Sequence, residues 1–162
     1  MNDRNCESYV RWTDYETGEV CVSFEDEDGI WERRTFTSHT DNVTITEIKK
    51  SSKDSKIDMV ISIDDVSSMK KFGLRDENFM QYKKLVDEDG SYIAQAAHYP
   101  SYEGSELKNG GYAGVTYVLN IGGTKEKILL ENTDEKQNVG EEQNPAVKIC
   151  GAEAVYLITK TG

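Results

Sequence analysis

Hydrophobic and polar residues alternate in short runs along most of the chain, and turn residues separate the runs. The clearest pair of runs is Ile30–Ser38 and Asn42–Ile48, joined by a polar turn at residues 39–41. Aromatic and β-branched residues fill both runs and neither contains proline, a composition typical of antiparallel strands. We expect the rest of the fold to be organised around this pair, with four of its side chains in the core: Trp31, Phe36, Val43 and Ile45.

The same alternation predicts strands before and after this pair. Upstream, Ser8–Tyr15 and Glu19–Glu25 flank a turn that ends at Gly18, so residues 8–50 are predicted to form a four-stranded meander with short hairpin connections. Downstream, further strands are expected at Lys56–Ile63, Phe79–Asp87, Ser91–Tyr99, Tyr112–Ile121, Thr124–Glu131, Ala146–Cys150 and Ala152–Thr161. The last two are either separate short strands or one strand that bends at Gly151.

Two segments lack the alternation of a strand. Asp64–Asn78 has room for one short helical turn, and Asn132–Pro145 is polar and acidic without an apolar anchor, so we expect the latter to be mobile. Turn signals at intervals of roughly 8–12 residues are the signature of a sandwich of antiparallel strands. The pattern therefore predicts an all-β antiparallel β-sandwich of about ten strands with little helix.

Chain length and net charge indicate how many domains the chain forms and which partners are excluded. The chain has 162 residues, enough for one domain with its own core, and we expect 1–162 to be that single domain. Its formal net charge of −11 repels phosphate backbones and anionic lipid, so we expect neither nucleic acid nor a membrane as a partner. A polar start runs directly into the first strand, and we therefore expect a piece of a longer protein.

No constellation of catalytic residues stands out. The two histidines, His39 and His98, do not lie beside a nucleophile turn such as G-x-S-x-G, which argues against a Ser-His-Asp triad. With 30 acidic residues, a pair of carboxylates at the spacing of a glycosidase arises by chance, so the acids are interpreted as a solvated surface. The sequence predicts no catalytic residue and no cofactor.

The acidic turns and the cysteines each have a simpler structural interpretation. Residues 26–29 and 87–90 both read Asp-Glu-Asp-Gly and offer oxygen ligands, but they lack the later Glu of an EF-hand loop, so hairpin turns and no metal are predicted. Cys6, Cys21 and Cys150 have no metal-binding spacing. Cys21 and Cys150 are expected as small buried side chains, and a disulfide between Cys6 and Cys21 is left open.

The loop from His98 to Tyr112 is the segment that most resembles a binding site. Exposed aromatic rings stack on sugar faces, and three tyrosines of this loop are therefore candidate residues for binding an oligosaccharide: Tyr99, Tyr102 and Tyr112. The alternative is a structured loop whose rings cover the end of the sandwich. Sequence alone leaves both interpretations open.

A family resemblance is clearest in the strand-turn-strand at Trp31–Ile45. Its pattern of Trp31, Arg33, Phe36, Ser38, Asp41 and Val43 resembles the N-terminal domain of glycoside hydrolase family 95 and the related family 65-like N-terminal domains. The hairpin at Tyr9–Val20, the strand at Gly111–Tyr117 and the closing segment Cys150–Thr161 are similar to that domain as well. The resemblance therefore spans most of the chain.

This resemblance implies a large β-sandwich, of the super-sandwich type, that packs against an (α/α)6 barrel. In such enzymes the barrel carries the catalytic carboxylate and asparagine residues, so the resemblance implies a non-catalytic domain that supports the barrel and lends a loop to the substrate cleft. The parent enzyme is expected to resemble a bacterial, secreted or periplasmic α-L-fucosidase or α-L-galactosidase. The alternatives are a free-standing carbohydrate-binding module and a cell-surface interaction domain.

Overall fold

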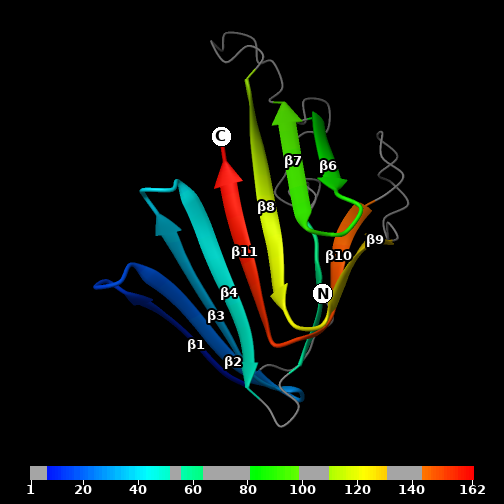
Figure 1. Cartoon of the computed structure of the whole chain (residues 1–162). Coiled ribbons are helices and arrows are strands. Elements are labelled where there is room, and N and C mark those ends of the chain that lie inside the picture. Colours follow the sequence, from blue (N-terminus) through cyan, green and yellow to red (C-terminus); the bar gives the residue numbers. More distant parts are fainter. Residues whose placement is uncertain (1–6, 52–55, 64–80, 99–109, 131–143) are drawn as a thin grey trace, which may run out of the picture.

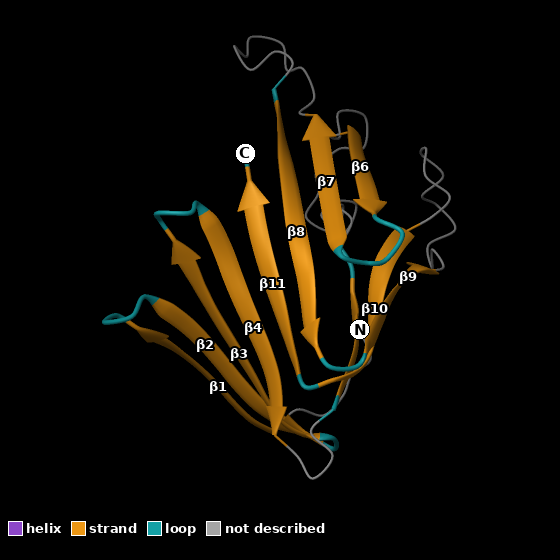
Figure 2. Ribbon diagram, in the orientation of Figure 1, coloured by secondary structure: helices purple, strands orange, loops and turns teal. Residues whose placement is uncertain are grey.

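The fold is a sandwich of two antiparallel sheets, as a computed structural model of the chain shows for residues 7–51, 56–63, 81–98, 110–130 and 144–162 (Figures 1 and 2). These residues form eleven strands and no helix. A helix long and apolar enough to cross a membrane is therefore absent from the described residues. The prediction of an all-β antiparallel β-sandwich of about ten strands is therefore confirmed. The predicted helical turn at residues 64–78 lies outside the described residues.

Eight strands form the larger sheet and three form the smaller one. The larger sheet has the order β1-β2-β3-β4-β11-β8-β7-β6, and the smaller sheet has the order β5-β10-β9. In chain order, the strands are β1 (Glu7–Asp14), β2 (Glu19–Asp26), β3 (Gly29–Ser38), β4 (Val43–Ser51), β5 (Ile57–Ile61), β6 (Gln81–Val86), β7 (Tyr92–His98), β8 (Gly111–Ile121), β9 (Thr124–Leu130), β10 (Asn144–Ala152) and β11 (Ala154–Thr161).

The first four strands form the predicted meander. In this meander and in the hairpin of β6 and β7, acidic side chains accept hydrogen bonds from the backbone of the turns. The Asp26 carboxylate accepts a hydrogen bond from the backbone N–H of Asp28 at 2.9 Å in the turn between β2 and β3. In the second Asp-Glu-Asp-Gly turn, Asp87 accepts from the N–H of Tyr92 at 2.8 Å, and Asp89 accepts from the N–H of Ser91 at 3.0 Å. Both acidic segments are hairpin turns, as predicted.

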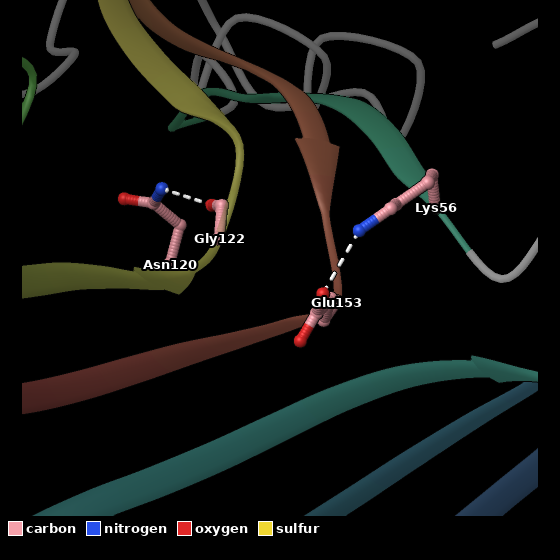
Figure 3. A network of polar contacts seen from close by, with 4 residues as sticks. All are labelled: Lys56, Asn120, Gly122 and Glu153. Carbon is pink, nitrogen blue, oxygen red and sulfur yellow. Dashed lines mark hydrogen bonds and ion pairs between the residues drawn. The ribbon is translucent and has the colours of Figure 1, made fainter.

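The two sheets are joined at one corner, where the chain crosses between them twice. It passes from β8 to β9 through residues 122–123, and from β10 to β11 at Glu153. Figure 3 shows the polar contacts there: Lys56 pairs with Glu153 at 2.9 Å, and the Asn120 amide donates to the carbonyl of Gly122 at 2.7 Å. Glu153 also donates its backbone N–H to the carbonyl of Ile121 at 2.7 Å, which ties the two crossings together.

The core lies between the smaller sheet and one face of the larger sheet. Strand β10 contacts β6 and β8, whereas β1 and β2 extend away from the smaller sheet (Figure 1). Burial of these apolar side chains is the main stabilising contribution to such a fold. The fully or almost fully buried cluster consists of Ile57, Val86, Ile93, Val118, Val147, Ile149, Ala152 and Val155.

Two details of the sequence prediction are wrong. Phe36, Val43 and Ile45 were expected in the core with Trp31, but only Trp31 packs against it. The strand pairing places the other three on the face of the larger sheet that points away from the smaller sheet, where Phe36 is 38% exposed and Val43 and Ile45 are half-buried. The segment predicted to be mobile, Asn132–Pro145, extended too far, because its last two residues already belong to β10. Pro145 is tolerated there because it pairs only with β9, and the pairing of β10 with β5 begins at Val147.

The cysteines that the structure describes are free thiols. Cys21 is buried, as predicted, whereas Cys150 is only half-buried. Burial away from water is the largest cause that raises the pKa of the Cys21 thiol. Cys6 lies outside the described residues.

Candidate functional site

Strand register assigns every side chain of the larger sheet to one of two faces, because successive residues of a strand point to opposite sides. Trp31, Ile48 and Val155 belong to the face that packs against the smaller sheet, which we call the inner face. Phe36 is an odd number of residues from Trp31 and therefore lies on the opposite, outer face. The strand pairings then place one apolar row across five strands of the outer face: Phe36, Ile45, Ile158, Tyr117 and Tyr92.

The outer face presents apolar side chains to solvent. Tyr92 and Tyr117 pack with ring centroids 5.0 Å apart, yet Tyr92 remains 47% exposed. Most large apolar side chains that are exposed in the larger sheet point to this face, including Val10, Trp12, Ile30, Phe36, Leu85, Tyr92, Val115 and Ile121. The row from Phe36 to Tyr92 connects two of these exposed side chains through three half-buried ones, and a continuous apolar strip is typical of an interaction site, whereas single exposed apolar residues are not informative.

A polar cluster interrupts the apolar surface at its centre. Glu47 lies directly opposite Tyr156 in the neighbouring strand β11. The Tyr156 hydroxyl donates to Oε1 of Glu47 at 2.7 Å, and Nζ of Lys49 lies 2.7 Å from the same oxygen. Two donors thus share one carboxylate oxygen, and the side chain of Glu47 is only 23% exposed.

These contacts fix the charges of the cluster. The hydrogen bond from Lys49 is the largest cause that lowers the pKa of Glu47, and the Tyr156 hydroxyl adds to it against the opposing effect of burial. The hydrogen bond to Glu47 also raises the pKa of Tyr156 and that of Lys49. At neutral pH the cluster therefore holds a carboxylate, an ammonium group and a protonated phenol.

Of the three tyrosines predicted to bind an oligosaccharide, Tyr112 lies within the described residues, and it is not on the outer face. Tyr99 and Tyr102 lie outside the described residues. Tyr112 lies in β8, pairs with Ala97 and is half-buried on the inner side of the sheet. Binding of an oligosaccharide by Tyr99, Tyr102 and Tyr112 stays a prediction.

Sequence reasoning missed the outer face, although a signal for it was present. Strands β8 and β11 contain uninterrupted apolar runs, Tyr117–Leu119 and Val155–Ile158, in place of strict alternation. Such runs are typical of strands that are buried on both faces. Among the described residues, no group of three or more His, Cys, Asp or Glu side chains is placed to hold a metal ion.

Comparison with known families identifies the kind of domain. The model for the N-terminal domain of glycosyl hydrolase family 65 matches residues 1–159. The chain belongs to this family of glycoside hydrolase N-terminal domains. No curated protein matches the chain.

Proposed function

We propose that the chain is the non-catalytic N-terminal domain of a glycoside hydrolase and that its outer face docks onto the catalytic domain, a helical (α/α)6 barrel. The single observation that carries the proposal is the apolar row from Phe36 to Tyr92, exposed at both ends and half-buried between them, on a sheet whose other face packs against the smaller sheet. A second protein layer on this face would remove the apolar area from water. Family membership supplies the kind of protein in which that layer is expected.

A charge substitution in the outer face tests the docking. In the full-length parent enzyme, Phe36→Glu is expected to uncouple the two domains, so that thermal unfolding changes from one shared transition to two separate ones. The matched control is Val60→Glu, because Val60 is 48% exposed on the outside of the smaller sheet and away from the proposed contact. Equal behaviour of the two variants would contradict the assignment of the outer face.

The non-catalytic role has its own assay. Purified residues 1–162 are expected to show no turnover of aryl glycosides, whereas the full-length parent hydrolyses at least one of them. Turnover by the isolated chain that survives further purification would refute the proposal.

The specificity of the parent is the finer part of the proposal. We infer an α-L-fucosidase-like parent from the strand-turn-strand at Trp31–Ile45, which resembles family 95. A panel of aryl glycosides offered to the parent enzyme tests this inference, and the α-L-fucoside is expected to be the best substrate. Preference for a different sugar would overturn the specificity and leave the docking role intact.

A further inference from the structure

We propose that Arg34 is the polar anchor of the outer face and that the docking surface of the catalytic domain presents an Asp or Glu carboxylate to it. The inference rests on the proposed docking function and adds the chemistry of the partner. Arg34 lies in β3, directly opposite Cys21 of β2 on one side and Glu47 of β4 on the other. The register thus places its side chain on the outer face, within the polar cluster at the centre of the apolar surface.

Aromatic side chains flank Arg34 on two sides. Phe36 is two residues further along the same strand, and Trp12 lies in the same cross-strand row, beyond Cys21. Both are exposed, Trp12 at 43% and Phe36 at 38%, and Arg34 itself is exposed. Arginine and tryptophan are among the residues that dominate the binding free energy of protein interfaces.

The guanidinium of Arg34 has no carboxylate partner within the described part of the chain. The nearest acid across the sheet, Glu47, is already bonded to Lys49 and Tyr156 through Oε1. Arg34 acts on Glu47 only through longer-range attraction, the last of the causes that lower the pKa of that carboxylate. Two further acids lie near Arg34 on this face without facing it: Glu32 is opposite Lys49, and Glu19, two residues from Cys21 along β2, is opposite Asp14.

Docking would therefore remove the Arg34 guanidinium from water without giving it a carboxylate partner from this domain. A charge that is buried without a partner is strongly destabilising, because it loses its hydration and gains nothing in return. The planar guanidinium matches a carboxylate through two parallel hydrogen bonds, which lysine cannot reproduce. A carboxylate on the catalytic domain is thus the group that satisfies Arg34 when the outer face is covered.

The adjacent residue provides a matched control for the experiment. Arg33 is exposed like Arg34, but it pairs with Val22 and Ile48 and so points to the inner face. In the full-length parent, Arg34→Glu and Arg34→Ala are expected to split the shared unfolding transition into two, whereas Arg33→Glu and Arg33→Ala leave it intact. Thermal unfolding of residues 1–162 with each substitution shows whether the domain itself still folds.

A rescue screen then identifies the partner group. Each exposed Asp or Glu of the catalytic domain is changed to Arg in the Arg34→Glu background, and one change is expected to restore the shared transition. If Arg34→Glu uncouples the domains and none of the acid-to-Arg changes restores the shared transition, a carboxylate partner is refuted. The partner group of Arg34 would then be a backbone carbonyl.

The design separates failure of this inference from failure of the docking function. If Phe36→Glu uncouples the domains while the Arg34 and Arg33 variants behave alike, the anchor is wrong and the docking face stands. If neither Phe36→Glu nor Arg34→Glu has an effect, the docking face itself is overturned.

Discussion

The absence of one Cβ atom at Gly123 allows the two sheets to join. Gly123 has φ of 65°, in the left-handed region, and a Cβ placed there would lie 2.3 Å from the carbonyl oxygen of Cys150. Gly123→Ala is therefore expected to lower the free energy of unfolding by roughly 2–4 kcal/mol, through backbone strain and displacement of β10. Urea unfolding of residues 1–162 measures the loss.

Gly18 is the matched control for this substitution. It has φ of 74°, similar to Gly123, but a Cβ there would meet nothing within 4 Å. Gly18→Ala should therefore show the backbone strain alone, about 1 kcal/mol. If the two alanine variants lose the same stability, the close approach at the corner is not what requires glycine.

The Glu47 cluster makes a prediction about pH. The folded pKa of Glu47 is lowered, so its contribution to stability is present above the unfolded pKa near 4.5 and is lost as the pH falls through the folded value. Glu47→Gln is expected to cost up to about 1 kcal/mol at pH 7, and this difference from the wild type should shrink below pH 4.5. Chemical unfolding at several pH values between roughly 3 and 7 measures it.

Glu153→Gln serves as the comparison for Glu47. The pKa of Glu153 is also lowered, mainly by its hydrogen bond with Lys56, but the Glu153 side chain is 62% exposed. Salt screens such an exposed pair, so its effect should fade in high salt while that of the partly buried Glu47 persists. A Glu47 effect that is independent of pH would contradict the role of its ionised carboxylate.

At the scale of elements, the positions of the strands were easier to predict from the sequence than the pairing of one strand with another. Alternation and turn chemistry predicted β1 to β4 and both Asp-Glu-Asp-Gly hairpins, because these depend on neighbouring residues. Strand β5 pairs with β10, and the paired residues are 86 to 95 positions apart in the sequence. This pairing depends on contacts that no local pattern encodes. The family resemblance supplied the sandwich as a whole, but not this pairing.

The site was harder to predict than the fold for a related reason. Alternation tells which residues share a face, but it does not tell which face another layer covers. Phe36 and Trp31 are both aromatic and were both assigned to the core, although an odd spacing of five residues puts them on opposite faces. Only the position of the smaller sheet distinguishes the inner face from the outer one.

Strand β10 is the element on which the core depends most, and this can be tested. Ile149 has no exposed surface and belongs to the buried cluster. Ile149→Ala should lower the free energy of unfolding by about 2–5 kcal/mol through the cavity that it leaves. The control Val60→Ala, at a 48% exposed position of the same sheet, should change it by about 0.5 kcal/mol or less. Similar losses in the two variants would argue against the assigned core.

For the molecule as a whole, charge and apolar surface act in opposite directions. The isolated chain carries a net charge of −11, which keeps copies apart, while the uncovered outer face favours their association. The Debye length falls from about 10 Å at 0.1 M salt to about 3 Å at 1 M, so added salt removes the repulsion and leaves the apolar attraction. Residues 1–162 are therefore expected to be monomeric at low salt and to self-associate at high salt.

The double variant Phe36→Thr with Val115→Thr should suppress this association, because both side chains are exposed on the outer face and threonine preserves the preference for a strand. Sedimentation velocity across a salt series measures the association, and urea unfolding checks that stability is retained.

Val60→Thr on the smaller sheet controls for the general loss of exposed apolar surface and should associate like the wild type. If the control suppresses association as strongly as the double variant does, the attraction is not localised on the outer face. A specific effect of the double variant alone would mean that the same apolar surface that self-associates in isolation is available to the catalytic domain in the parent enzyme.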